Sequence, residues 1–272
     1  MTATAPASAK VDGDVTTRKV WASAADAVAD IPDGASLAVG GFGASGVPDL
    51  LVEALAAGDA GGFEVISNNC GTEDYGLGLL LAAGRIRRII ASFIGGNALF
   101  AKQYLSGELD VELTPQGTLS ERLRCGGAGI PAFFTPAGVG TPVADGGIPV
   151  RYAPDGSVAV TSPPKEVRSF PGAWSDREYV LENAITADYA LVHAHTGDTE
   201  GNLVFNLAAR NFNPLAAMAG KVCIAQVENL VEAGEIDPAQ VHLPGIFVDR
   251  IVHAGPQNKY IEKRTVRDAV ED

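Results

Sequence analysis

The chain has 272 residues, of which 46% are hydrophobic and 19% are charged, with 32 glycines and 16 prolines. This composition is typical of a globular protein with many tight turns, and it excludes collagen-like, disordered and coiled-coil proteins. Acidic residues outnumber basic ones by 33 to 20, and the formal charge of -13 argues against a nucleic-acid partner but not against an anionic small molecule.

The first half of the chain alternates short apolar runs, which are typical of buried strands, with stretches of helical spacing. A strand over residues 36–39 enters a glycine-rich loop, and a helix follows after Pro48, because proline is tolerated at the first helical position. The other elements predicted here are strands over residues 63–67, 86–93 and 109–113 and helices over residues 78–83, 98–105 and 118–124.

The second half opens with a segment rich in glycine and proline, residues 131–171, for which we predict loops. Within it, Pro154-Asp155-Gly156 separates two short runs of β type, residues 150–152 and 158–160, which predicts a hairpin. Regular strands are predicted again over residues 177–185, 189–195, 203–205, 222–227 and 247–253.

This order of elements predicts an α/β fold, with a mostly parallel open sheet flanked by helices and a Gly/Pro-rich loop and hairpin as an insertion. No polar, charged linker divides the core. We therefore expect one domain over residues 20–254, between a flexible N-terminal tail, residues 1–19, and a charged C-terminal tail, residues 255–272.

Cysteine usage and hydropathy bear on the compartment. Cys70, Cys125 and Cys223 are odd in number and far apart, which predicts neither a disulfide framework nor a zinc site. Residues 1–19 lack the apolar segment of a secretory signal, and the uncharged run over residues 125–144 is interrupted by prolines and glycines that would break a spanning helix. We therefore expect a cytoplasmic protein without a membrane partner.

The glycine loop, Gly41-Phe42-Gly43-Ala44-Ser45-Gly46, fits the pattern G-x-G-x-x-G between a strand and a helix. Its glycines let backbone amides approach an anionic or carbonyl group closely. A dinucleotide site would also need an acidic residue at the end of the next strand, where this chain has Asn68 and Asn69. The loop alone therefore leaves two interpretations open, a nicotinamide-dependent oxidoreductase and a tight turn without a ligand.

Four other side chains have a reactive type but a weak context. His193 and His195 share one face of a strand, but the sequence offers no third ligand, so we predict no metal site. Ser45 is not part of a nucleophile elbow, because Val47 stands where the last glycine of G-x-S-x-G should be. Cys70 is interpreted as a small buried residue.

Seven blocks of sequence, in the same order along the chain, resemble the signatures of family I coenzyme A transferases. The first contains the glycine loop, and the seven cover residues 33–48, 66–69, 76–80, 103–109, 113–119, 126–133 and 209–213. The similarity runs from about residue 20 into the C-terminal tail, where residues 259–264 are also family-like. Within that family the chain is similar to the α subunits of the enzymes that act on succinyl-CoA and a 3-oxoacid.

The resemblance implies a ping-pong transfer of CoA through a glutamyl-CoA thioester, with the CoA thioester as a substrate and no cofactor. In the family, the reacting glutamate belongs to a Ser-Glu-Asn-Gly motif of the β subunit. This chain has no such motif, and Glu182-Asn183 and Glu228-Asn229 are interpreted as ordinary strand positions. The resemblance therefore implies a β-subunit partner, an α2β2 assembly and no activity of this chain alone.

The resemblance also assigns the site residues. Gln116 follows a predicted strand and matches the residue whose amide stabilises the oxyanion of the tetrahedral intermediate. The residues implied in binding substrate or CoA are those of the glycine loop and the asparagine pair: Gly41, Phe42, Gly43, Ala44, Gly46, Asn68 and Asn69.

Departures from the family leave the acyl specificity open. Typical members have basic residues where this chain has His193, Thr196 and Asn206, and acidic residues where it has Gly96 and Leu99. Succinyl-CoA with acetoacetate is the default pair, and a less charged or bulkier 3-oxoacid, or 3-oxoadipate, is the alternative. A sugar-phosphate isomerase or a ligand sensor is a further alternative, which the absence of a basic phosphate cluster disfavours.

Overall fold

The computed structural model of the chain describes residues 19–171, 176–257 and 260. The predicted N-terminal tail therefore lies outside the described residues except for Lys19, whose ammonium group donates to the carbonyls of Glu200 and Gly245 at 2.9 Å. Of the predicted C-terminal tail, only residues 255–257 and 260 are described. Among the described residues, no helix is long and apolar enough to cross a membrane.

A nine-stranded sheet forms the centre of the described part of the chain, and every pairing in it is parallel except that of β12 with β11. In spatial order its strands are β1 (Val20–Trp21), β14 (Arg250–His253), β13 (Gly220–Val231), β11 (Ala187–Asp198), β2 (Ser36–Val39), β3 (Phe63–Ile66), β4 (Ile86–Ala91) and β5 (Asp110–Leu113), with β12 (Leu203–Val204) beside β11. The strand order reverses between β2 and β11, the position at which open parallel sheets bind ligands.

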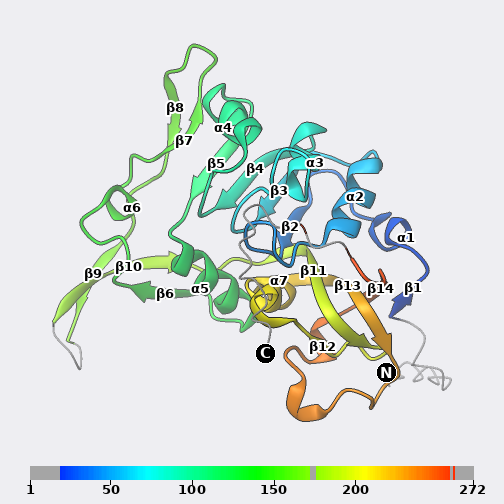
Figure 1. Cartoon of the computed structure of the whole chain (residues 1–272). Coiled ribbons are helices and arrows are strands. Elements are labelled where there is room, and N and C mark those ends of the chain that lie inside the picture. Colours follow the sequence, from blue (N-terminus) through cyan, green and yellow to red (C-terminus); the bar gives the residue numbers. More distant parts are fainter. Residues whose placement is uncertain (1–18, 172–175, 258–259, 261–272) are drawn as a thin grey trace, which may run out of the picture.

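Helices cover both faces of this sheet (Figure 1). Leu37 and Val39 of β2 point into one core and Ala38 into the other, as the two-residue period of a strand requires. The first core lies under α1 (Ala24–Val28), α2 (Asp49–Ala57), α3 (Leu77–Ala82) and α4 (Ala98–Leu105), and the second lies under α5 (Gln116–Gly127) and α7 (Asn213–Ala219). The predicted α/β architecture is confirmed.

An arm of β structure, drawn in green, extends from the main sheet (Figure 1). It consists of an antiparallel three-stranded sheet, a two-stranded ribbon and a short helix: β6 (Ala132–Thr135), β10 (Arg177–Asn183) and β9 (Val167–Phe170), then β7 (Pro149–Tyr152) and β8 (Val158–Thr161), with α6 (Pro142–Asp145). On the small sheet, the rings of Phe134, Phe170 and Tyr179 pack edge to face. The ribbon is the predicted hairpin, which is confirmed.

Several sequence predictions of local structure are wrong in detail. The segment 131–171 is not only loops and a hairpin, since it also contains β6, α6 and β9. The strand predicted over 177–185 ends at Asn183 and belongs to the small sheet, because it pairs with β6 and β9. The strand predicted over 247–253 begins at Arg250, after a turn of 3-10 helix, η3 (Gly245–Phe247). Helices α1 and α7 and the 3-10 turns η1 (Leu207–Arg210) and η2 (Pro238–Gln240) were not predicted.

Candidate functional site

The carboxyl ends of neighbouring parallel strands bring the predicted site residues together. The glycine loop follows β2, Asn68 and Asn69 follow β3, and Gln116 is the first residue of α5, after β5. Because parallel strands end at the same edge of the sheet, these three segments meet beside the point where the strand order reverses. The helix predicted to begin at residue 118 thus begins two residues earlier, at Gln116.

The glycine loop is a tight turn held by its own backbone. Phe42 and Ser45 exchange two N–H to carbonyl bonds of 3.0 Å each, which leaves Gly43 and Ala44 at the tip. Gly43 has a φ of 56°, in the left-handed region that favours glycine, and a Cβ built there would have no heavy atom within 4 Å. Gly43 is therefore the position of the loop at which a ligand could approach the backbone.

A continuous chain of hydrogen bonds links the three segments. The side-chain amide of Gln116 donates to Oδ1 of Asn68 at 2.8 Å, and the hydroxyl of Ser92 donates to the same oxygen at 2.7 Å. Asn68 in turn donates to Oδ1 of Asn69 at 3.1 Å, and that oxygen also accepts the backbone N–H of Gly43 at 2.9 Å. Both asparagines are buried. The arrangement fixes the amide of Gln116 and the backbone of Gly43 relative to each other.

Gln116 lies at the edge of a shallow cavity of about 290 Å³ between the glycine loop, α5 and α7. Its side chain is exposed, and one of its two N–H groups serves Asn68. Among the described residues that line this cavity there is no carboxylate; they are Phe42, Gln116, Gly117, Ser120, Asn211, Phe212 and Leu215. The cavity can therefore donate hydrogen bonds to a developing negative charge but supplies no acidic nucleophile of its own.

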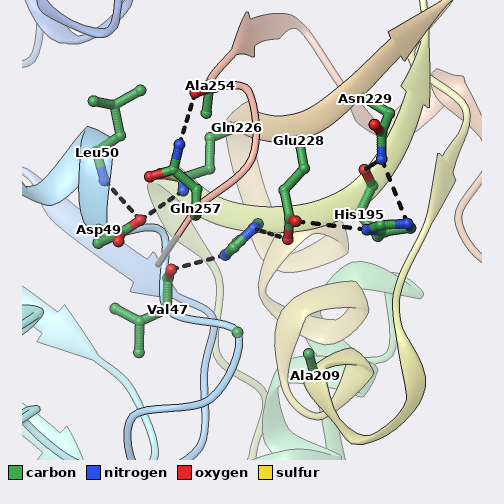
Figure 2. A network of polar contacts seen from close by, with 12 residues as sticks. Val47, Asp49, Leu50, His195, Ala209, Gln226, Glu228, Asn229, Ala254 and Gln257 are labelled. Atoms are coloured by element: carbon green, nitrogen blue, oxygen red, sulfur yellow. Dashed lines mark hydrogen bonds and ion pairs between the residues drawn. The ribbon is translucent and has the colours of Figure 1, made fainter. Parts of the chain in front are cut away.

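A second cavity, of about 310 Å³, lies on the other side of the glycine loop, and ionisable side chains such as His193, His195 and Glu228 line it. His193 Nε2 lies 3.0 Å from one carboxylate oxygen of Glu228, and His195 Nδ1 lies 3.6 Å from the other (Figure 2). The register of β11 on β13, which pairs Ala194 with Val227, brings these residues together. Glu228 lies within β13, as predicted, and its carboxylate also faces two histidines of β11.

His193 is held at both of its ring nitrogens. Its Nδ1 lies 3.0 Å from the carbonyl oxygen of Val47, while its Nε2 faces Glu228. A carbonyl oxygen only accepts, so Nδ1 carries a proton and donates to Val47. His193 and Glu228 are each 9% exposed. In the part of the chain that the structure describes, no group of three His, Cys, Asp or Glu residues is arranged to hold a metal ion.

A tyrosine and a carboxylate complete the wall of this second cavity. The hydroxyl of Tyr75 donates to Asp49 at 3.5 Å, and Asp49 also accepts from the amide of Gln226 at 2.7 Å. Burial above all, and then the negative charges of Asp49 and Glu53, raise the pKa of Tyr75, so its phenol stays protonated and acts as a donor. The ring of Tyr75 stacks on that of Tyr260, with centroids 4.9 Å apart.

Two asparagines near the glycine loop received no individual role from the sequence. Asn211 accepts the N–H of Gly41 at 3.2 Å and donates to the carbonyl of Ser45 at 3.0 Å. Asn213, which is fully buried, donates to the carbonyl of Gly46 at 2.9 Å. Both lie in a block that resembles the family signatures, residues 209–213, and that resemblance was the available signal. Cys70 is buried as predicted, and burial raises the pKa of its thiol.

Comparison with known proteins decides what kind of chain carries this site. The sequence model of the family described as coenzyme A transferase matches residues 21–254, which include both cavities except Tyr260. The chain belongs to the coenzyme A transferase family. The match spans the glycine loop and favours the transferase interpretation over a nicotinamide-dependent oxidoreductase.

Within the family, this transferase chain is 60% identical over 249 residues to a protein of Mycobacterium tuberculosis that is named as one subunit of a probable succinyl-CoA:3-ketoacid coenzyme A transferase. That alignment covers 92% of this chain and 99% of the relative. The chain is 49% identical over 248 residues to human mitochondrial succinyl-CoA:3-ketoacid coenzyme A transferase 2, covering 91% of this chain and 47% of that one.

Among solved structures, the transferase chain is similar to the acyl-CoA transferase apoenzyme from Escherichia coli O157:H7, with a TM-score of 0.70 and 25% identity. The alignment covers 90% of this chain and 48% of that one. The chain therefore spans about half the length of both the human relative and the bacterial structure. It matches nearly the whole length of the mycobacterial relative, which is named as one subunit.

The departures from typical family members do not form a single cluster in the transferase chain. His193 and Asn206 line the second cavity, and Thr196 lies on the same strand as His193, opposite Val204 and Asn229. Gly96 and Leu99 lie near the start of α4 and line neither cavity beside the glycine loop.

Proposed function

We propose that the chain is the α subunit of a CoA transferase that moves CoA from an acyl-CoA, with succinyl-CoA as the default, to a 3-oxoacid, with acetoacetate as the default. The observation that carries this proposal is the 60% identity to the mycobacterial subunit of a probable succinyl-CoA:3-ketoacid coenzyme A transferase, over 99% of the length of that relative. The domain that serves this function is residues 20–254, and the compartment is the cytoplasm.

The proposed reaction needs a carboxylate from a partner chain. A glutamate oxygen of this partner attacks the thioester carbonyl, the C–S bond breaks, and CoA thiolate leaves behind an acyl-glutamyl anhydride. The thiolate then attacks the glutamyl carbonyl and releases the first carboxylic acid, which leaves a glutamyl-CoA thioester. The second acid reverses both steps, takes up CoA and restores the glutamate. No proton transfer, metal or redox cofactor is required for this balance.

In this mechanism the role of Gln116 is to donate its remaining N–H to the oxyanion that forms when the thioester carbonyl is attacked. The bond from Gln116 to Asn68 supports this role, because it holds the amide in one orientation before the substrate arrives. An amide suits the task because it donates a hydrogen bond and does not compete for protons. Gly41, Phe42, Gly43, Ala44 and Gly46 are proposed to line the path of the thioester, with Asn68 and Asn69 beneath them.

The partner in this proposal is a β subunit with the glutamate motif, in an α2β2 assembly. Two facts support it: the relative of matching length is named as one subunit of its enzyme, and the human relative is about twice as long. A cavity that has hydrogen-bond donors and no carboxylate among its described lining residues also fits a site completed by a second chain.

A second acyl pair is proposed as the alternative. His193 and Asn206 line the cavity beside the glycine loop where typical family members have basic residues, and Asp49 and Glu228 line it too. A cavity with this charge favours a less anionic or bulkier 3-oxoacid over a small charged one if the acyl chain enters it. Transfer of CoA to 3-oxoadipate, a dicarboxylate, would show that the acyl chain of the substrate lies outside this cavity.

The test is an assay of this chain co-expressed with a β subunit that contains Ser-Glu-Asn-Gly. We expect the purified complex to transfer CoA from succinyl-CoA to acetoacetate with ping-pong kinetics, and each chain alone to be inactive. Full transfer by this chain alone would contradict its assignment as an α subunit. Calorimetric binding of NADH without binding of any CoA thioester would overturn the transferase proposal.

A further inference from the structure

Three successive carbonyl groups, the last two of the glycine loop and the one that follows it, are each bound by a different side chain from the neighbouring part of the fold. Ser45, Gly46 and Val47 present the carbonyls, and Asn211, Asn213 and His193 donate to them in that order, at 3.0, 2.9 and 3.0 Å. The donors come from β11 and from the segment that leads into α7, whereas the loop follows β2. We call these three donors the carbonyl clamp.

The carbonyl clamp is itself held in place on two sides. Oδ1 of Asn213 accepts the backbone N–H of His193 at 2.9 Å, so two members of the clamp are bonded to each other. The imidazole ring of His193 is oriented by Glu228 at its second nitrogen, as a carboxylate commonly orients a histidine. The clamp therefore has little freedom to follow the loop if the loop shifts.

Two glycines of the region are explained by the clamp and not by a ligand. A Cβ at Gly40 would lie 2.0 Å from Oδ1 of Asn213. A Cβ at Gly46 would lie 2.6 Å from the carbonyl oxygen of Ala209 and 2.9 Å from Nδ2 of Asn213. Only at Gly43, among the loop glycines, does a Cβ meet open space. Gly40 and Gly46 are therefore explained by close contact with the clamp region, whereas Gly43 is open toward the candidate site.

The clamped carbonyls of residues 45–47 and the open tip of the loop at Gly43 are connected by the short turn between them. The backbone bridge between Phe42 and Ser45 ties the clamped carbonyls to the tip of the loop, where the N–H of Gly43 meets Asn69. A tilt of the peptide planes at residues 45–47 would consequently move Gly43 away from Asn69 and disturb the hydrogen-bond chain to Gln116. Small displacements of this kind are costly at a reacting centre.

We propose that Asn211, Asn213 and His193 are positioning residues for the transferase reaction: by holding the carbonyls of residues 45–47 they set the place of the Gly43 backbone beside Gln116. This inference rests on the proposed function. In this proposal the functional contact of His193 is the hydrogen bond from Nδ1 to the Val47 carbonyl, and Glu228 orients the imidazole ring.

The experiment compares two replacements of His193 in the complex with the β subunit. His193→Asn places an N–H donor near the position of Nδ1 and keeps the bond to Val47, whereas His193→Gln reaches toward the position of Nε2 and Glu228 instead. We expect kcat of His193→Asn to stay within about 3-fold of the wild type, and kcat of His193→Gln to fall at least about 10-fold, with KM for the thioester nearly unchanged in both. A kcat for His193→Gln equal to or above that of His193→Asn would overturn the proposal.

Asn211→Ala gives a second readout that does not depend on turnover. It removes the donor to the Ser45 carbonyl, so amide hydrogen exchange at Gly43, whose N–H is bonded to Asn69, should accelerate about 10-fold, while the Tm of the complex stays near that of the control variant Asn183→Ala, an exposed residue on β10. Unchanged exchange at Gly43 would contradict the clamp. A wild-type complex that moves no CoA would refute the proposed function, and the exchange measurement would still decide about the clamp.

Discussion

Gln116 is exposed and Gly43 is half-buried, and each is hydrogen-bonded to one residue of the asparagine pair. Replacing Gln116 with alanine in the complex removes the proposed oxyanion donor and keeps a helix-forming residue at the start of α5. We expect kcat to fall about 10²-fold, which corresponds to ~2.7 kcal/mol of transition-state stabilisation, with the assembly unchanged. Ser120→Ala, one turn further along α5 at the same cavity, serves as the control in steady-state assays. An unchanged kcat in Gln116→Ala would remove this residue from the mechanism.

Gly43→Ala tests whether the tip of the glycine loop contributes to CoA transfer beyond the effect of backbone strain on stability. Alanine there has a positive φ and costs on the order of 1 kcal/mol of stability. Gly84, at the end of α3, has a φ of 65° and equally open surroundings, so Gly84→Ala has the same cost away from the site. We expect equal losses of Tm in the two variants and a loss of CoA transfer only in Gly43→Ala. Equal activity in both would separate the loop from the substrate.

The sequence indicated some site residues through their type and place, and others were beyond its reach. Gln116 could be selected because it follows a strand and matches a family block. Glu228 could not, since its meaning depends on the pairing of β11 with β13, which places it beside His193 and His195. In the sequence, a strand residue that faces the candidate site cannot be distinguished from any other strand residue until the register of the strands is known.

At the scale of elements, a partly buried ion-pair network connects the edge of the main sheet to α5 and the arm. Glu112 of β5 accepts from Arg88 of β4 at 2.5 Å and from Arg122 of α5 at 2.7 Å. Arg122 also donates to the carbonyl of Asn183 on β10 at 2.9 Å. Burial raises the pKa of Glu112, but the two arginines outweigh it, and the pKa lies below its ordinary value of 4.5.

The sign of the pH dependence follows from that lowered pKa. Glu112 contributes stability above pH of about 4.5, and the contribution is lost as the pH falls through the lower folded-state value. We expect Glu112→Gln to reduce the free energy of unfolding by roughly 1–3 kcal/mol at pH 7 and by much less at pH 3, as measured by denaturant titration. Glu121→Gln, which breaks an exposed pair with Arg124, should show little difference at either pH. A constant difference across the pH range for Glu112→Gln would contradict this interpretation.

Elements were predictable where a single periodicity dominates the local sequence. Strands β2 and β3 and the end of β4 are mostly buried and give short, mainly apolar runs, whereas β5, at the edge of the sheet, alternates polar and apolar residues. Strands β6 and β9 are half-buried or exposed and lie among glycines and prolines, so the local signal indicated loops. Helix α7 has a proline in its first turn and follows an irregular segment, and its position is fixed by packing on β11 and α5.

At the scale of the whole molecule, Leu207 marks a surface that we expect the β subunit to cover. Its side chain is 88% exposed, and its φ of 47° is in the left-handed region, an unusual backbone for leucine. Leu207→Asn relieves the strain, because asparagine tolerates this region better, and removes the apolar contact. We expect an unchanged or slightly higher Tm for the chain alone and a Kd for the β subunit that rises about 10-fold in titrations.

A matched control distinguishes this contact from a general loss of surface hydrophobicity. Leu105 is 56% exposed at the end of α4, away from both cavities. Leu105→Asn should leave the Kd for the β subunit unchanged. If Leu207→Asn also leaves it unchanged, the partner binds elsewhere on the chain.

The pairing of β2 with β11 at the centre of the sheet has a consequence for synthesis on the ribosome. Ser36 and Asp188, whose side chains are hydrogen-bonded across these strands, are 152 positions apart in the sequence. While the chain is being made, β2 to β5 can assemble first, but β2 remains an open apolar edge until β11 emerges. His193 emerges with β11, and Asn211 and Asn213 emerge after it. A nascent chain halted before β11 would therefore contain the glycine loop and Gln116 without the groups that order the loop, and it would expose a strand edge that invites aggregation.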